Sequence, residues 1–305
     1  MAAWAARCLD STPFWQALIS PDRLQSWRAI TTNGYVDLQV PDSDRSLART
    51  VRAHRSAVRA LPEAHRPRLL AVEPRHRALL LTIPRGQRAD RGEYSAEPRV
   101  YRNAGSVLHT WHQHATTLPA AHEESAQYAR QYADRIDRII CKHATGISPA
   151  ATGAIEASLT LLRQHASSLP AAYGHGAFGP RAWLCTNTYR VTLTCYGQAR
   201  PMPAAFDFAR PALFWTENPA LASAFTIGYR RRPTPDEAHL VPALTVLASF
   251  DDLHQVSKTE DADCSYAAKH LDLAIEQFNR SSHMSTSVDT PSSYDSHTTL
   301  RDATA

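Results

Sequence analysis

Lysine and glycine are both scarce in this sequence of 305 residues. Only three of its 33 Lys and Arg residues are lysines: Lys142, Lys258 and Lys269. Residues 1–141 contain none, and Gly34 is the only glycine before Gly86. The segment before Gly86 therefore offers neither a glycine-rich loop, whose backbone N–H groups wrap phosphates, nor a lysine to stand beside one.

Cysteines, net charge and long apolar runs are limited as well. The number of cysteines is odd and no C-x-x-C pair occurs, so neither a disulfide framework nor a zinc site is implied. We expect a reducing, cytoplasmic location. A net charge of +4 indicates no nucleic-acid partner. No uncharged apolar run could span a membrane, and Arg7 and Asp10 make the N-terminal segment a short amphipathic helix rather than a signal peptide.

Residues 1–84 have a strand-rich pattern. Val36, Leu38 and Val40 alternate with polar residues and predict a strand at 35–40. A helix is expected at 44–61, followed by two strands within 68–84 around a turn at 73–76.

Helical spacing dominates the later part of the chain. The expected elements are helices with apolar stripes at 100–111, 128–140 and 155–162, two short strands at 183–186 and 189–194, and helices at 219–229, 236–254 and 261–278. The pattern indicates an α+β protein of two lobes. We expect a small strand-rich lobe with an N-terminal helix (1–84), a hinge (85–95), a large helical lobe (96–280) and a disordered Ser/Thr/Asp-rich tail (281–305).

Several segments, in order along the chain, resemble the aminoglycoside phosphotransferase and choline-kinase-like family. "PRLLAVEPRHRALLLTIPRG" is similar to that family's two strands before the hinge, and "YRNAGSVLHTWH" to the helix after it, with Trp111-His112 where a Leu-His pair is usual. "FDFARPALFWTENPALASAFTIGYRR" is similar to the segment that follows the metal site, with Asp207 and Trp215 in register. The resemblance spans residues 25–280 in fragments and implies a bilobal protein-kinase-like fold.

"YGHGAFGPRAWL" (173–184) stands where this family has its catalytic loop, H-G-D-x-x-x-x-N. In the family, the Asp positions the acceptor hydroxyl and takes its proton, and the Asn binds magnesium. His175 keeps the pattern, but Ala177 replaces the Asp and Ala182 the Asn. Counting back from Asp207, the second metal-binding Asp falls on Cys195. Alanine offers no ligand and thiol sulfur suits magnesium poorly, so the resemblance implies that the base and both metal ligands are missing.

The small lobe of the family supplies a phosphate-binding Lys, which pairs with a Glu on the next helix. The alignment places Gln39 at the Lys and Thr50 at the Glu. Because no lysine precedes Lys142, no other register supplies one, and arginine does not replace its compact charge.

The groups that survive near the loop favour structural roles. We interpret His175 as a hydrogen-bonded structural histidine rather than an acid or base. Cys195 is interpreted as a small residue that fills an empty metal site rather than a thiol nucleophile, and Asp207 as an anchor for the next helix rather than a ligand. The histidines of "LHTWHQHA" favour an ordinary helix surface, and no metal site is expected.

The missing groups together indicate a pseudokinase, meaning a kinase-like fold without transfer chemistry. We expect a non-catalytic binding or scaffold subunit, which the resemblance places in bacterial specialised-metabolite or modified-peptide biosynthesis. Its partner would be a protein, or a peptide or small molecule in a cleft of the helical lobe. The cleft candidates are His175, Arg181, Asp207 and Trp215. No cofactor, nucleic-acid partner or membrane partner is expected.

Two alternatives stay open. A phosphotransferase with rewired catalytic residues, acting on a small hydroxylated molecule or a peptide, would use ATP or GTP with magnesium. It needs a new carboxylate at the old metal site, for which Asp37, Asp207 and Glu217 are the candidates. A decaying gene product is the other alternative, although the regular apolar stripes argue against it.

Overall fold

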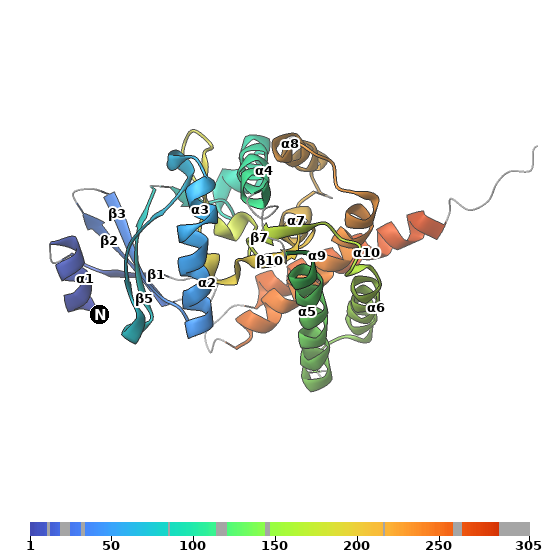
Figure 1. Cartoon of the computed structure of the whole chain (residues 1–305). Coiled ribbons are helices and arrows are strands. Elements are labelled where there is room, and N and C mark those ends of the chain that lie inside the picture. Colours follow the sequence, from blue (N-terminus) through green and yellow to red (C-terminus); the bar gives the residue numbers. More distant parts are fainter. Residues whose placement is uncertain are drawn as a thin grey trace, which may run out of the picture.

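The computed structural model describes residues 1–10, 13–18, 25–31, 34–84, 86–113, 121–143, 147–215, 217–258 and 264–286 (Figure 1). An antiparallel sheet at the N-terminal end is followed by a larger, mainly helical part. The α+β class expected from the sequence is confirmed.

The N-terminal sheet has five strands, in the order β1-β2-β3-β5-β4. Their bounds are β1 Gln16–Leu18, β2 Gln25–Thr31, β3 Gly34–Val40, β4 Arg68–Glu73 and β5 Ala78–Ile83. Alternation along β3 gives the sheet two unlike faces. Val36 and Leu38 pack against the helix α1 (Ala2–Leu9). Tyr35 and its neighbours two residues apart, Asp37 and Gln39, lie on the opposite face, which is turned toward the helical part.

Two helices between β3 and β4 replace the single helix expected at 44–61. Helix α2 (Asp44–Arg55) is capped by the Ser43 hydroxyl, and α3 (Ala57–Ala60) follows after a break at Ser56. The Ser56 hydroxyl donates to the Arg52 carbonyl oxygen at 2.8 Å. Ser56 itself leaves the helical conformation, with φ of −120° and ψ of −88°, and this divides the two helices. Two short 3₁₀ turns, η1 (Glu63–His65) and η2 (Pro74–His76), flank β4.

The helical part surrounds one large apolar core. Its helices are α4 Pro98–Gln113, α5 Ala121–His143, α6 Pro149–His165, α7 Phe206–Ala212, α8 Pro219–Tyr229, α9 Pro235–Val256 and α10 Ser265–Thr286, with a 3₁₀ turn, η3 (Gly92–Ala96), before α4. Helices α4 and α8 touch through glycines, because a Cβ on Gly228 would lie 1.9 Å from the Arg102 carbonyl oxygen. This close packing fixes α4, which carries His112 to the site described below.

Two small sheets lie within the helical part. The first joins β6 (Gln87–Arg88), β8 (Trp183–Cys185) and β9 (Val191–Leu193), and includes both short strands expected from the sequence. The second pairs β7 (Ala171–Gly174) with β10 (Arg200–Pro203) and was not expected. Prolines 201 and 203 in β10 account for the omission, because proline is disfavoured inside strands. Together the two sheets hold the loop 174–183 in place.

The C-terminal helix is longer than expected. Helix α10 continues to Thr286, so residues 281–286 are helical rather than part of a disordered tail. They continue a helix that packs on α9. Residues 287–305 lie outside the described part of the chain. Across the described residues, no helix combines the length and apolar character needed to cross a membrane.

Candidate functional site

The loop between β7 and β8 is where the sequence places a degenerate catalytic loop. It leaves β7 at Gly174, turns at Gly176 and enters a 3₁₀ turn, η6 (Pro180–Ala182), before β8. Gly176 has φ of +77°, and a Cβ there would meet the Gln198 side chain at 2.8 Å. Glycine is required at this turn both by conformation and by space.

A buried carboxylate holds the beginning of this loop. Asp207, on α7, accepts hydrogen bonds from the backbone N–H groups of His175 (2.7 Å) and Gly176 (2.8 Å). Its third bond, at 2.9 Å, comes from Nε2 of His112, whose Nδ1 lies 2.7 Å from the Tyr229 hydroxyl. Burial opposes ionisation of Asp207, but the hydrogen bond and charge of His112 outweigh it and keep the pKa of the carboxyl below its usual value. Asp207 therefore anchors the loop, and not only its own helix.

His175 is enclosed and serves as a structural link. Its Nε2–H donates to the Thr194 carbonyl oxygen at 2.8 Å, and its Nδ1 accepts the Ala177 N–H at 3.3 Å. Burial lowers the pKa of His175 to about 4, so the ring is neutral near pH 7. Both ring nitrogens are occupied and the side chain is inaccessible, which leaves no route for proton exchange with a ligand.

The structure brings two of the three substituted positions, Ala182 and Cys195, close together. The Ala182 carbonyl oxygen accepts hydrogen bonds from the Thr194 N–H (2.9 Å) and hydroxyl (3.1 Å), and Cys195 follows Thr194 directly. Ala182 is buried, whereas Ala177 and Cys195 are half-buried. Cys195 has φ of +68°, a left-handed conformation that Asp and Asn adopt several times more readily than other non-glycine residues. The backbone at Cys195 thus has a shape that suits an aspartate better than a cysteine.

The side chains at these positions do not fit magnesium. Magnesium requires hard oxygen ligands, and Ala177, Ala182 and Cys195 provide none from their side chains. No group of three or more His, Cys, Asp and Glu side chains that could hold a metal occurs within the described ranges.

The three carboxylates considered as replacements are placed elsewhere. Asp207 is fully used by the contacts above, and Glu217 is exposed. Asp37 is paired with Arg28 across β2 and β3, at 2.7 and 2.9 Å.

Gln39 and Thr50, which align with the family's phosphate-binding Lys and its partner Glu, are both buried. Gln39 lies on the face of β3 turned toward the helical part and is buried. Thr50, on α2, is also buried, and its hydroxyl donates to the Ser46 carbonyl oxygen of its own helix at 2.9 Å. Helix α2 contacts the 3₁₀ turn η7 (Tyr196–Gln198), where a Cβ on Gly197 would lie 2.7 Å from the Ser46 hydroxyl.

Aromatic rings fill the space between α2 and the loop. His54, on α2, meets the ring of Tyr196 edge-on at 4.8 Å between centroids. Tyr196 stacks on Trp111 at 5.4 Å and also contacts His175. Burial lowers the pKa of His54 to about 4, and neither of its ring nitrogens has a hydrogen-bond partner among the described residues. This region beside the loop is closed by side chains.

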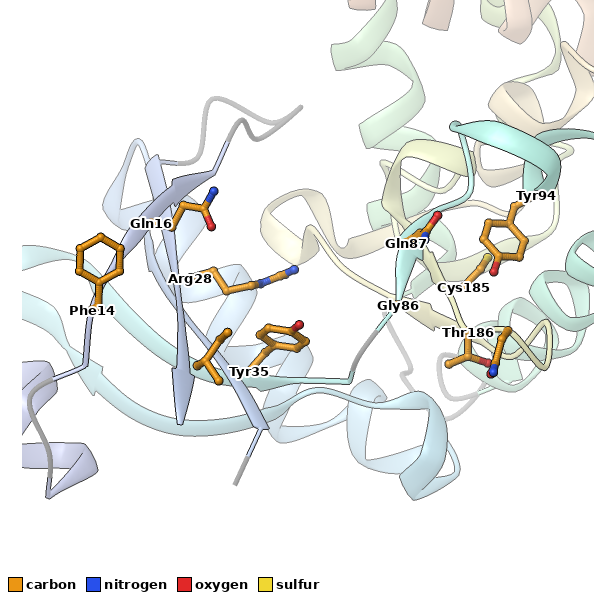
Figure 2. A pocket seen from close by; sticks show the side chains of 11 residues that line it. Phe14, Gln16, Arg28, Tyr35, Gly86, Gln87, Tyr94, Cys185 and Thr186 are labelled. Carbon is orange, nitrogen blue, oxygen red and sulfur yellow. The ribbon is translucent and has the colours of Figure 1, made fainter. Parts of the chain in front are cut away.

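An open cavity lies between the sheet and the helical part, away from these rings (Figure 2). Its volume is about 760 Å³. From the sheet it is lined by Phe14, Gln16, Arg28, Ile30 and Tyr35, and from the other side by Gly86, Gln87, Tyr94, Cys185, Thr186 and Asn187. Phe14 and Ile30 are 89% and 70% exposed, although both are large and apolar. The Arg28–Asp37 ion pair at its wall leaves little net charge there.

The four residues expected to line a binding cleft are not gathered in one. His175 and Asp207 are enclosed, and Trp215 packs against Phe225 with ring centroids 5.4 Å apart. Arg181 lines a second, much narrower cavity of about 40 Å³ near α10, where its guanidinium lies over the Tyr266 ring. Of the four, only Arg181 lines either cavity, so the binding cleft expected in the helical lobe stays a prediction.

Sequence reasoning missed His112 and the Arg28–Asp37 pair. The histidines of the α4 segment were interpreted as helix surface, but His112 is buried and binds Asp207. His112 stands where the family has the His of a Leu-His pair, and this could have indicated a specific role for it. The separation of Arg28 and Asp37 by nine residues could have indicated a cross-strand pair, had a strand been expected at 25–31.

Comparison with known proteins gives a clear answer for the fold. No protein-family model matches the sequence, and no curated protein matches it. A thermostable mutant of aminoglycoside phosphotransferase APH(4)-Ia, in its apo form, superposes with a TM-score of 0.62 over 94% of this chain and 100% of its own, at 14% identity. The chain has the aminoglycoside phosphotransferase fold.

Other structures with this fold agree. A choline/ethanolamine kinase family protein from Mesorhizobium loti gives a TM-score of 0.60 at 15% identity, covering 95% of this chain and 96% of its own. Macrolide 2'-phosphotransferase MphH from Brachybacterium faecium gives 0.56 at 18% identity, covering 91% and 96%. The fold is thus a protein-kinase-like one, shared with phosphotransferases for small molecules, while identities this low establish the fold alone.

Proposed function

We propose that this protein binds a small organic ligand between its sheet and its helical part and does not phosphorylate it, acting as a non-catalytic binding subunit. One observation carries the proposal. The loop and the strand end to which the resemblance assigns the base and the magnesium ligands are joined by the hydrogen bonds from Thr194 to Ala182, but present Ala177, Ala182 and Cys195. Phosphoryl transfer relies on positioning and on neutralisation of phosphate charge, and these side chains provide neither.

The nearby carboxylates support the same proposal. A rewired phosphotransferase would need a carboxylate free to hold magnesium. Asp207 already accepts three hydrogen bonds, and Asp37 is held by Arg28. Releasing either would leave a buried charge or buried N–H groups without partners, which costs several kcal/mol.

The open cavity supports the binding half of the proposal. Its volume is within the range of sites for small organic ligands, and its exposed Phe14 and Ile30 would be covered by a bound molecule. Structures with this fold hold AMP, or ADP with hygromycin B or with spectinomycin. We therefore propose an uncharged or weakly charged ligand with an apolar or aromatic portion, of nucleoside or aminocyclitol size.

The transfer half is tested by turnover. We expect the protein to release no ADP, GDP or phosphate from ATP or GTP with magnesium above the protein-free background, because Ala177, Ala182 and Cys195 supply neither a base nor a metal ligand. An active aminoglycoside phosphotransferase with its antibiotic is the assay control. Magnesium-dependent turnover that disappears in Asp37→Asn would overturn the proposal in favour of a rewired enzyme.

The binding half is tested by thermal shift with adenosine and spectinomycin as probes, neither of which carries a phosphate. We expect at least one to raise the melting temperature of the wild type and of Ile227→Trp, but not of Ile30→Trp. Ile30 and Ile227 are both exposed, and only Ile30 lines the cavity. A tryptophan at position 30 occupies the space that a ligand needs. A wild type that responds to neither probe would contradict a ligand of this size.

A further inference from the structure

Most of the half-buried arginines among the described residues form ion pairs with carboxylates. The pairs are Arg28–Asp37, Arg88–Asp90, Arg135–Asp251, Arg210–Asp252 and Arg231–Glu237. Each joins a guanidinium to a carboxylate that is at least half-buried, so that neither charge is left alone. An arginine held in place without such a partner is therefore an exception in this protein.

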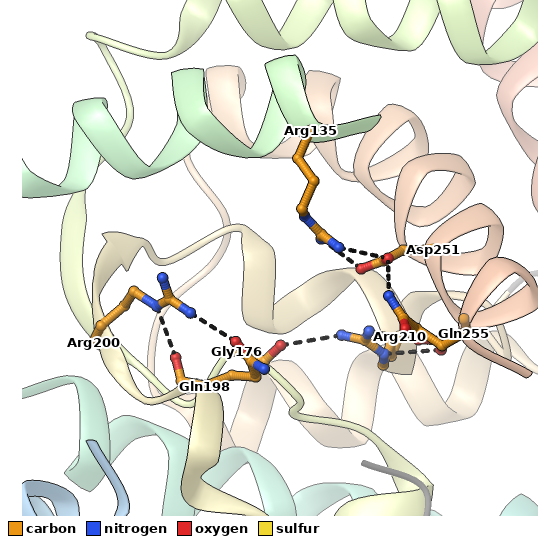
Figure 3. Close-up of polar contacts among 8 residues, drawn as sticks. Arg135, Gly176, Gln198, Arg200, Arg210, Asp251 and Gln255 are labelled. Atoms are coloured by element: carbon orange, nitrogen blue, oxygen red, sulfur yellow. Dashed lines mark hydrogen bonds and ion pairs between the residues drawn. The ribbon is translucent and has the colours of Figure 1, made fainter. Parts of the chain in front are cut away.

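Arg200, on β10, is such an exception (Figure 3). Its Nε donates to the Gln198 carbonyl oxygen at 3.2 Å, and an NH2 group donates to the Gln198 side-chain oxygen at 2.7 Å. Its guanidinium also lies 4.8 Å from the centre of the Tyr128 ring. These neutral contacts fix the side chain in one orientation but do not neutralise its charge.

Helix α2 brings further positive charge to the same place. Ser46 lies against Gly197, three residues before Arg200, and Arg49 follows Ser46 by one helical turn. Burial, together with the charges of Arg200 and Arg45, lowers the pKa of Arg49 to about 10. Within the described ranges, no carboxylate lies within ion-pair distance of Arg45, Arg49 or Arg200. Positive charge from α2 and from β10 is thus gathered where α2 packs against the turn before β10.

We propose that Arg49 and Arg200, flanked by Arg45, bind the phosphate group of a phosphate monoester and so bridge α2 to β10. A guanidinium presents a planar fork of donors that matches the oxygens of a phosphate. A dianion between two or three arginines removes the repulsion between them and gains charge-assisted hydrogen bonds. Because Gln198 and Tyr128 already hold Arg200, little side-chain freedom is lost on binding.

This site goes beyond the proposed function and does not depend on it. None of its three arginines lines the cavity between the sheet and the helical part, and the binding requires no magnesium. Free phosphate and the phosphate of an ester share the same recognition chemistry. They differ in the remainder of the molecule, which two probes can separate.

Thermal shift and calorimetry with inorganic phosphate and with O-phosphoserine test this site, against chloride at equal ionic strength. We expect both probes to raise the melting temperature of the wild type more than chloride does. Arg49→Gln and Arg200→Gln are each expected to weaken phosphate binding by about tenfold or more, the effect of losing a hydrogen bond to a charged group. Arg138→Gln removes an exposed arginine of α5 and is the matched control, expected to bind as the wild type does.

The stability of the variants without phosphate distinguishes binding from a structural role. Arg49→Gln relieves like-charge repulsion, so we expect its melting temperature without phosphate to equal or exceed that of the wild type. A purely structural arginine would show a decrease instead. Equal phosphate responses in Arg49→Gln and Arg138→Gln, or no response beyond that to chloride in the wild type, would overturn the proposal. A response to inorganic phosphate but none to O-phosphoserine would overturn its monoester part.

Discussion

Replacing Asp207 with alanine is expected to lower the free energy of unfolding by about 3–5 kcal/mol, the usual cost of removing one partner of a buried charged network. The change leaves the backbone N–H groups of His175 and Gly176 without acceptors and His112 without its carboxylate. His112 and His175 remain buried in the folded state, so water cannot replace the oxygen atoms that they lose. Equilibrium denaturation in urea measures the effect directly.

The control for this experiment is Glu217→Ala. Glu217 is an exposed carboxylate in the segment after α7, so its replacement should change the stability by no more than about 0.5 kcal/mol. Asp207→Asn keeps one acceptor oxygen, so its loss of stability is expected to lie between those of Asp207→Ala and Glu217→Ala. If Asp207→Ala were within about 1 kcal/mol of the wild type, the carboxylate would not be the anchor of the loop.

Stability is also expected to decrease markedly as the pH falls from about 6.5 to 4. Burial lowers the pKa of His54 and of His175 to about 4, from an ordinary value near 6.5. In this window the unfolded chain binds protons at both histidines while the folded chain does not, so protonation favours unfolding. Each histidine contributes up to about 3 kcal/mol of destabilisation, which is complete near pH 4.

Chemical denaturation at a series of pH values, for the wild type and His54→Leu, measures this contribution. The variant removes a ring whose nitrogens have no partner in the described part of the chain, so we expect it to lose part of the pH dependence and to be more stable than the wild type at pH 5. His76→Leu, at an exposed position, is the matched control. Parallel pH profiles for His54→Leu and the wild type would show that His54 is not kept neutral by burial.

The sequence allowed much of the fold to be predicted, because its periodic segments are long. The apolar alternation of 35–40 and the stripes of α4, α5 and α6 each depend on residues close together in the chain. Strand β10 was not predicted because its prolines disfavour a strand locally. Pairing with β7 overrides this effect in the folded protein. The break at Ser56 was not predicted, because it is a change in the backbone of one residue that leaves the apolar spacing of 44–61 intact.

The geometry around the loop was less predictable than the fold. The register from Asp207 back to Cys195 rests on the resemblance and stays a prediction, and the left-handed backbone of Cys195 is one that aspartate adopts readily. The bond from His112 to Asp207 spans 95 residues, and nothing in either local pattern indicates it. The open cavity depends on how the sheet faces the helical part, which no periodicity encodes.

The magnesium dependence of nucleotide binding tests the central claim most directly. Calorimetry with ATP, in magnesium and in EDTA, compares the wild type with Cys195→Asp, which restores an oxygen ligand where the backbone favours aspartate. Without metal ligands, the wild type should give the same result with magnesium and with EDTA, whether or not ATP binds, and only Cys195→Asp should gain affinity from magnesium. Wild-type ATP binding that EDTA abolishes would show an intact metal site and contradict the account.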